Sequence, residues 1–105
     1  MVSIVIVTHS EELAAGIAEL AGQMAGEESV PIFPAGGTED GRLGTSFEKV
    51  TQALGQALEE GESVLILMDL GSAVMVVESG IEGLPQAAKH RIRLTNAPIT
   101  EGAIA

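Results

Sequence analysis

Two side chains suited to phosphoryl transfer each stand at the end of an apolar run. His9 closes the β-branched stretch over residues 2–10, and Asp69 closes a second run over residues 63–69. A carboxylate beside an imidazole accepts a hydrogen bond from one ring nitrogen, which leaves the lone pair of the other nitrogen free as a nucleophile. If the two run ends meet in the fold, the pair predicts an oriented histidine that attacks a phosphoryl group.

Two short segments are candidates for holding the oxygens of that phosphoryl group through backbone N–H groups. One is a glycine-rich turn after the apolar run over residues 30–34, and the other is the start of an expected helix after Asp69. Free N–H groups in such turns and at helix starts attract anions. The six predicted phosphate-binding residues are Gly36, Gly37, Thr38, Gly71, Ser72 and Ala73.

A less specific interpretation of His9 stays open, because a histidine at a strand end is more commonly an ordinary polar residue than a nucleophile. The nearby carboxylate, the glycine-rich turn and the helix starts favour the nucleophile. Nothing comparable surrounds His90, which we interpret as a surface residue. A phosphate-accepting Asp69 of the receiver type would need an acidic cluster for magnesium after the first run, where Thr8 and His9 stand instead.

The composition limits the cofactors that the chain can hold. The sequence has no cysteine and only two histidines, so a metal cage of His and Cys side chains is excluded. It also has no Walker pattern and no dinucleotide fingerprint. We therefore expect no cofactor and no metal of its own, and a phosphoryl group that arrives from another protein.

The charge balance narrows the range of partners. Five Lys and Arg against fifteen Asp and Glu give a formal net charge of -10, which disfavours nucleic acid and anionic membranes and favours a partner with a basic face. The first residues include no basic region, and the apolar run is too short for a signal peptide or a membrane span. We interpret the protein as cytoplasmic.

Hydrophobic periodicity places strands and helices in alternation along the chain. Continuous or alternating apolar runs predict strands over residues 2–10, 30–34, 63–69 and 91–95, and the 3.6-residue period predicts helices over 11–24, 45–58 and 70–79. A further helix is expected from Ile99. Because a helix that short is marginal, we expect that the single domain, residues 1–105, lacks part of it.

Several residues are predicted to fix the helix ends and the buried helix faces. Ser10 is the expected cap of the first helix, Thr45 and Glu48 form a capping box for the second, and Gly61 is expected to end the second helix in a left-handed conformation. The predicted apolar stripe of the first helix is Leu13, Ile17, Leu20 and Met24. That of the second helix is Phe47, Val50, Leu54 and Leu58.

This alternation predicts an α/β fold: an open, mainly parallel four-stranded sheet with helices on both faces. We expect the strand order 2-1-3-4, with the second strand at the edge because Pro31 and Pro34 cannot donate to a ladder. That order puts the switch point between the first and third strands. His9 and Asp69 would then open into one crevice.

Four motifs together resemble a known family: VTHS at residues 7–10, PAGGT at 34–38, MDLGSA at 68–73 and NAPITEG at 96–102. The whole chain is similar to the phosphotransferase subunit of the phosphoenolpyruvate-dependent dihydroxyacetone kinase, a relative of the mannose-type IIA domains of the sugar phosphotransferase system. The DLGSA segment at residues 69–73 and the NAP segment at 96–98 resemble the kinase branch rather than the sugar-transport branch.

The resemblance implies a homodimeric phosphocarrier enzyme with a mannose-type IIA-like fold. An HPr-like donor would phosphorylate His9, and Asp69 would orient the imidazole. His9 would pass the phosphoryl group to ADP on the kinase's nucleotide subunit, with ADP or ATP and Mg on that partner, and another subunit would bind dihydroxyacetone. The alternatives are a mannose-type IIA component of sugar transport and a non-catalytic flavodoxin-like binding module.

Overall fold

The computed structural model describes residues 2–24, 30–38, 40, 44–69 and 71–95, which form four strands and four helices. The predicted helix from Ile99 lies outside the described residues. In chain order the elements are β1 (Val2–Thr8), α1 (Glu11–Met24), β2 (Ile32–Gly36), α2 (Phe47–Glu60), β3 (Ser63–Met68), α3 (Gly71–Glu82), α4 (Gln86–Lys89) and β4 (Ile92–Thr95).

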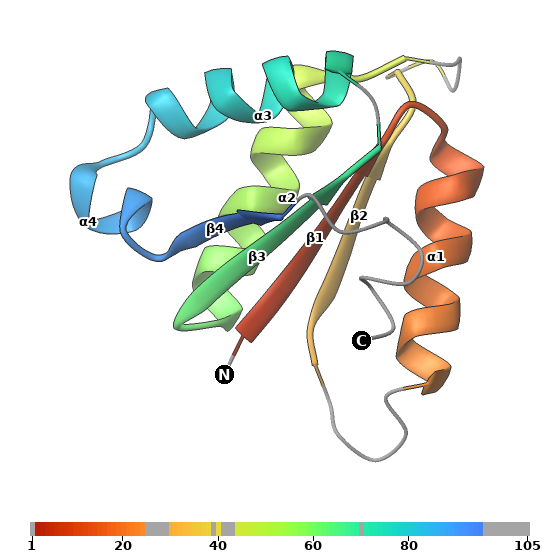
Figure 1. Ribbon diagram of the computed structural model, residues 1–105, viewed down its shortest axis with the longest axis horizontal. Coiled ribbons are helices and arrows are strands. Elements are labelled where there is room, and N and C mark those ends of the chain that lie inside the picture. Colours follow the sequence, from red (N-terminus) through yellow and green to blue (C-terminus); the bar gives the residue numbers. More distant parts are fainter. Residues whose placement is uncertain (1, 25–29, 39, 41–43, 70, 96–105) are drawn as a thin grey trace.

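The strands form one parallel sheet in the order β2-β1-β3-β4, which confirms the predicted order and the edge position of the second strand. Ile4 of β1 is in register with Ile32 of β2 on one side and with Leu65 of β3 on the other. Because all strands run in one direction, their carboxyl ends share one edge, called here the C-terminal edge. Helices α1, α2 and α3 all begin at this edge (Figure 1).

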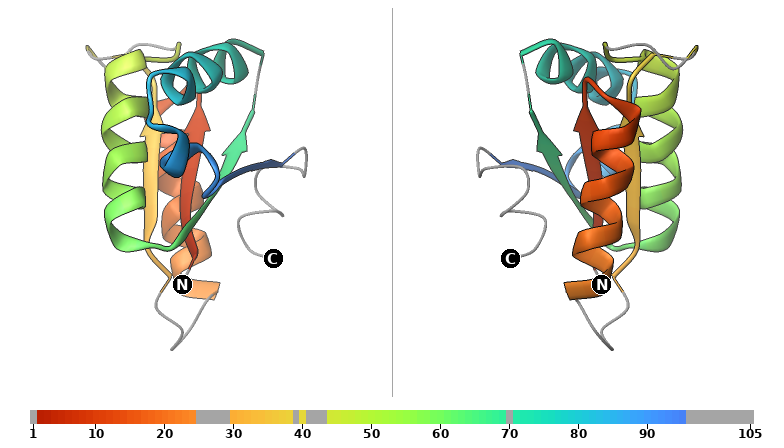
Figure 2. Two further views of the ribbon diagram at one scale, coloured as in Figure 1. Left: turned by 90° about the vertical axis from the view of Figure 1, so that its left-hand side faces the viewer. Right: turned by 90° about the vertical axis from the view of Figure 1, so that its right-hand side faces the viewer.

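Helices cover both faces of the sheet, as predicted (Figure 2). Three consecutive residues of β1, Val5, Ile6 and Val7, are fully buried, which requires cover on both sides of the strand. Val5 and Val7 belong to the core beneath α2 and α3, whereas Ile6 belongs to the core beneath α1. The sheet is therefore a rigid support for the residues at its C-terminal edge.

The predicted apolar stripe of α1 is wrong in its phase. The helix buries Ala14, Ile17 and Ala21, while Leu13 and Leu20 are exposed. Small side chains face the sheet because α1 packs close to β2: a methyl group on Gly36 would come within 2.8 Å of the Ala14 Cβ. Only Ile17 of the described stripe residues is in the core.

The ends of α2 also differ from the prediction. The N-cap is Ser46, whose hydroxyl accepts from the backbone N–H of Lys49 at 3.2 Å, so the capping box at Thr45 and Glu48 is wrong. Gly61 ends the helix with an extended φ of -122°, not a left-handed one. Glycine is needed there because a side chain would collide with Ser3 of β1.

The bounds of other strands and helices differ from the predicted ones by a few residues. The second strand covers Ile32–Gly36 and not residues 30–34, because its pairing with β1 runs on to the register pair Thr8 and Gly36. The third helix continues past Ser79 to Glu82. Gly80 does not end the helix, and it is buried where α3 meets α2. The short α4 follows it, and β4 begins at Ile92.

Candidate functional site

His9 and Asp69 meet at the C-terminal edge, as the strand order requires. They directly follow β1 and β3, whose last register pair is Val7 and Met68. The His9 Nδ1 lies 2.5 Å from Asp69 Oδ2, and the same oxygen accepts from the His9 backbone N–H at 3.1 Å. An ionised carboxylate only accepts hydrogen bonds, so the proton of the neutral imidazole is on Nδ1.

The other ring nitrogen remains available. Within the described part of the chain, His9 Nε2 has no hydrogen-bond partner. The His9 side chain is 35% exposed, whereas that of Asp69 is 9% exposed. The imidazole therefore has one edge held by a nearly buried carboxylate and the rest within reach of another molecule.

The backbone around His9 is fixed by the loop that follows β2. The N–H of Gly37 donates to the carbonyl of Thr8 at 3.4 Å, and the N–H of Gly44 donates to the carbonyl of His9 at 2.7 Å. Together with the bond from the His9 N–H to Asp69, these contacts hold the peptide groups on both sides of the imidazole. Such a fixed backbone keeps the ring pre-oriented.

Thr8 and Ser10 shape the turn from β1 into α1. The Thr8 hydroxyl accepts from the Ser10 N–H at 3.1 Å and donates to the Ser10 carbonyl at 2.5 Å. The Ser10 hydroxyl accepts from the Leu13 N–H at 3.2 Å, which confirms Ser10 as a cap of α1. This local network lets His9 sit directly between a strand and a helix start.

The predicted phosphate-binding turn lies beside His9. Its residues also have structural roles that do not involve a phosphate. A side chain on Gly36 would collide with the Ser10 carbonyl, and Gly37 has a φ of 73°, which favours glycine. Thr38 Oγ1 donates to Asp40 Oδ1. A phosphate-binding role for Gly36, Gly37 and Thr38 stays a prediction.

The second predicted segment stands two residues beyond Asp69, where α3 begins at Gly71. The side chain of Ala73 is fully buried in the core under α2 and α3, so any contact of Ala73 with a phosphoryl group would come from its backbone. Gly71 and Ser72 form the first turn of the same helix. Their phosphate-binding role also stays a prediction.

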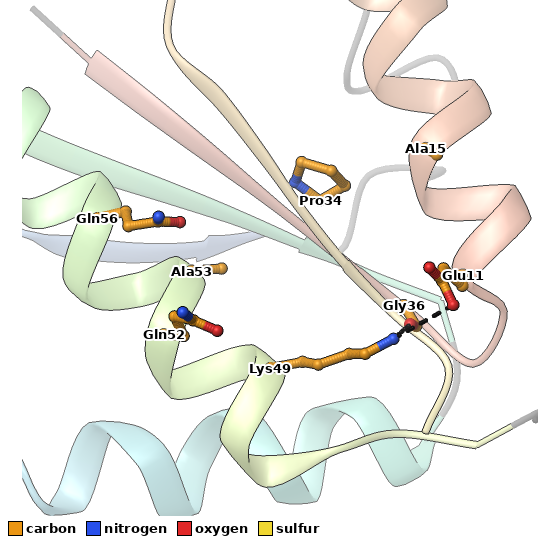
Figure 3. Close-up of a pocket in the computed structure, with 8 residues that line it drawn as sticks. All are labelled: Glu11, Ala15, Pro34, Gly36, Lys49, Gln52, Ala53 and Gln56. Atoms are coloured by element: carbon orange, nitrogen blue, oxygen red, sulfur yellow. Dashed lines mark hydrogen bonds and ion pairs between the residues drawn. The ribbon is translucent and has the colours of Figure 1, made fainter. Parts of the chain in front are cut away.

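Lys49 is a residue of this edge that sequence reasoning missed. Its Nζ donates to the Gly36 carbonyl at 3.0 Å and lies 3.4 Å from Glu11 Oε2, which ties α2, β2 and α1 together (Figure 3). It lines a pocket of about 290 Å³ beside Pro34 and Gln52. The sequence places Lys49 in the first turn of the second helix but gives no sign of its partners.

The described residues include no group of three His, Cys, Asp or Glu side chains that could hold a metal ion. No helix among them is long and apolar enough to cross a membrane. The chemistry that the site itself offers is nucleophilic attack by an imidazole whose other nitrogen is held by a carboxylate.

Comparison with known proteins shows which family and fold the chain shares. The family model EIIA-man, described as PTS system fructose IIA component, matches residues 3–105. Among solved structures, the crystal structure of the unknown-function protein EF1359 has a TM-score of 0.87 and 36% identity, covering 99% of this chain and 78% of that one.

Curated relatives carry a more specific description. The phosphoryl donor subunit DhaM of the PEP-dependent dihydroxyacetone kinase of Escherichia coli (strain K12) is 38% identical over 100% of this chain, which spans 22% of that protein. The corresponding DhaM of the first such kinase of Listeria innocua is 42% identical over 97% of this chain and 76% of its own length. The chain thus spans about a fifth of some relatives and most of others.

Proposed function

Because the chain belongs to the EIIA-man family of PTS IIA components, we propose that it is a phosphocarrier that accepts a phosphoryl group on His9. The observation that carries the proposal is the contact of His9 Nδ1 with Asp69 at 2.5 Å, on a ring that stays 35% exposed. This geometry supports a nucleophilic Nε2. It also supports an orienting role for Asp69.

The transfer step follows from the two ring nitrogens. The lone pair of Nε2 attacks the phosphorus of the donor, a new N–P bond forms, and the bond from phosphorus to the donor nitrogen breaks with its electron pair leaving on the donor. Nδ1 keeps its proton, so the phosphorylated imidazole carries positive charge next to the Asp69 carboxylate. Positioning and charge stabilisation are the main needs of such a loose transition state.

The donor in this proposal is an HPr-like phosphocarrier, and the acceptor is ADP on the nucleotide subunit of a dihydroxyacetone kinase. The chain then acts as the phosphoryl donor subunit of a phosphoenolpyruvate-glycerone phosphotransferase. Support comes from relatives at 34 to 42% identity that are named DhaM. In this proposal, ADP or ATP and Mg are bound by the nucleotide subunit, and a further kinase subunit binds dihydroxyacetone. The chain itself is proposed to be a cytoplasmic homodimer.

A second candidate function is a mannose-type IIA component of sugar transport, because the matching family model is described as a fructose IIA component. The chemistry at His9 is the same in both cases. The acceptor differs: a IIB protein takes the place of the nucleotide subunit. The curated relatives favour the kinase.

The test is a transfer assay with labelled phosphoenolpyruvate, enzyme I and HPr. We expect acid-labile, alkali-stable label on the chain, which passes to ADP when the ADP-loaded nucleotide subunit is added. A mannose-type IIB protein is the comparison acceptor and should take up little. Preferential transfer to the IIB protein would contradict the kinase assignment, and a chain without label would contradict the phosphocarrier itself.

A further inference from the structure

Lys49 stands where a cation is unfavourable unless it has a partner. It is in the first turn of α2, behind the Ser46 cap, where the positive end of the helix dipole repels a cation. Its Nζ donates to the carbonyl of the buried Gly36 at 3.0 Å and lies 3.4 Å from the exposed Glu11 (Figure 3). The bond to the Gly36 carbonyl places a full positive charge against the end of β2, next to the end of β1.

The Gly36 carbonyl is part of a hydrogen-bonded link to β1. It belongs to the same peptide group as the Gly37 N–H, and that N–H donates to the carbonyl of Thr8 at 3.4 Å. Gly36, Gly37 and Thr8 are all buried. The bond from Gly37 is long and therefore weak. A charge-assisted bond from Lys49 to the other end of this peptide polarises the group and makes the Gly37 N–H a stronger donor.

The next peptide group extends the link to the carboxylate. The Thr8 carbonyl and the His9 N–H belong to one peptide, and the His9 N–H donates to Asp69 Oδ2 at 3.1 Å. Because the C=O and the N–H of a trans peptide point in opposite directions, the three hydrogen bonds all run the same way. We call this series the relay. It begins at the Lys49 ammonium and ends at the Asp69 oxygen that also contacts the His9 ring.

The order of charges along the relay stabilises the ion at each end. Peptide dipoles aligned from a cation to an anion attract both ions, and the hydrogen bonds of such a chain polarise one another. The peptide groups of the relay lie among buried residues, and the side chain of Asp69 is 9% exposed, so water and salt screen little of this effect. A stronger bond from the His9 N–H holds the carboxylate charged and in one position.

We propose that Lys49 is a positioning residue for phosphoryl transfer and that it acts on Asp69 through the relay. The inference rests on the proposed phosphocarrier function and adds a residue that is bonded to Gly36 and Glu11. Lys49 keeps the Asp69 carboxylate aligned with Nδ1 of His9 while positive charge develops on the ring. No proton moves along the relay, because each group only strengthens the hydrogen bond that the next one donates.

The chain offers a control for each other role that Lys49 could have. Glu11→Gln removes the ion pair with α1 and leaves the bond from Lys49 to the Gly36 carbonyl. Lys89→Met changes the net charge by the same amount as Lys49→Met, but at the end of α4, before β4 begins. Lys49→Arg keeps a cation that can donate to a carbonyl and should restore the relay.

The first measurement is the rate of label uptake at several concentrations of phosphorylated HPr, with circular dichroism to verify folding. For Lys49→Met we expect kcat to fall about tenfold and KM to stay within about twofold, because the orientation of the reacting groups changes and donor binding does not. Lys49→Arg should recover most of the rate, and Glu11→Gln and Lys89→Met should transfer normally. An unchanged kcat in Lys49→Met, or an equal loss in either control, would overturn the proposal.

The second measurement follows the relay in the unphosphorylated, ¹⁵N-labelled chain through its amide proton shifts. In Lys49→Met the amide protons of Gly37 and His9 should move upfield, because both become weaker donors, and in Lys49→Arg they should return. The amide proton of Gly44 is the reference, since it donates to the His9 carbonyl at 2.7 Å outside the relay. Unmoved Gly37 and His9 signals, or an equal shift at Gly44, would refute the relay even if kcat falls.

The two measurements together separate the relay from the proposed function. If the unchanged chain takes up no label, the phosphocarrier function fails, whatever the amide shifts show. If it takes up label and the Gly37 and His9 signals do not respond to Lys49→Met, the relay fails and the function stands. If Lys49→Met does not fold, Lys49→Gln removes the same charge with a polar side chain, and the same loss of rate and the same shifts are expected from it.

Discussion

At the scale of single residues, the site consists of one imidazole and one carboxylate with distinct tasks. Asp69 accepts from both the ring and the backbone N–H of His9 through one oxygen, Oδ2. This fixes the orientation of the ring and the position of its proton at once. In the proposed function, the same carboxylate also faces the positive charge that develops when Nε2 is phosphorylated.

Replacing Asp69 by Asn should keep the fold and slow phosphoryl transfer by about 10²-fold or more, because the amide removes the negative charge beside the ring. The measurement is the single-turnover rate of label uptake from phosphorylated HPr. Glu60→Gln, which changes an exposed carboxylate at the end of α2, is the control and should transfer normally. An unchanged rate in Asp69→Asn would refute its orienting role.

Ser3 presents a different single-residue feature, a fully buried hydroxyl that has no hydrogen-bond partner among the described residues. An unsatisfied buried polar group costs about 1–3 kcal/mol. We expect Ser3→Ala to raise the free energy of unfolding by about 1 kcal/mol, measured by denaturant titration. Ser63→Ala, at the exposed register partner of Val2, should leave it nearly unchanged. Destabilisation by Ser3→Ala would show that the hydroxyl is satisfied.

At the scale of elements, the helix ends are tied to distant segments. The last turn of α2 carries Glu59 and Glu60 and no basic residue, an unfavourable charge for the C-terminal end of a helix. Arg91 supplies the missing cation: Nη2 donates to the carbonyls of Leu58 at 2.5 Å and Gly61 at 2.6 Å, and Nε donates to that of Glu62 at 2.9 Å. Residues before β4 thus cap α2.

Removing this cap should destabilise the fold. Arg91→Ala is expected to lower the free energy of unfolding by about 1–3 kcal/mol, and Arg91→Lys should restore part of it because an ammonium can still donate to a carbonyl. Arg93→Ala is the control, since among the described residues Arg93 donates to carbonyls of its own segment, those of His90 and Ile92. Equal effects of both alanine variants would contradict the capping role.

The elements also show how much of the structure can be predicted from a single sequence. The strand order and the meeting of His9 with Asp69 follow from alternating periodicity and parallel topology, and both were predictable. The phase of α1 was not, because Ala14 faces the sheet for a steric reason set by Gly36 of β2. The partners of Lys49 likewise depend on contacts among three elements that no local pattern encodes.

At the scale of the whole molecule, charge is the dominant feature. Among the described residues, Lys49 forms an ion pair with Glu11. With a formal net charge of -10, much of the acidic charge is unbalanced within the chain. Self-repulsion of this kind opposes the compact state and favours association with basic partners.

Salt should therefore stabilise the folded chain. Raising NaCl from about 50 mM to about 500 mM shortens the Debye length from about 14 Å to about 4 Å and screens the repulsion, so Tm should rise by a few degrees. Differential scanning calorimetry measures this shift. The variant Glu59→Gln, Glu60→Gln should respond less. A fall in Tm with salt would mean that attractive pairs outweigh the repulsion.

The central claim, that Nε2 of His9 carries the phosphoryl group, is tested most directly by NMR of the phosphorylated, ¹⁵N-histidine-labelled chain. We predict a nitrogen–phosphorus coupling at Nε2 of His9, with Nδ1 still protonated towards Asp69. His9→Ala should take up no label although His90 is intact, and His90→Ala should be phosphorylated normally. A phosphoryl group on Nδ1, or label retained in His9→Ala, would contradict the account.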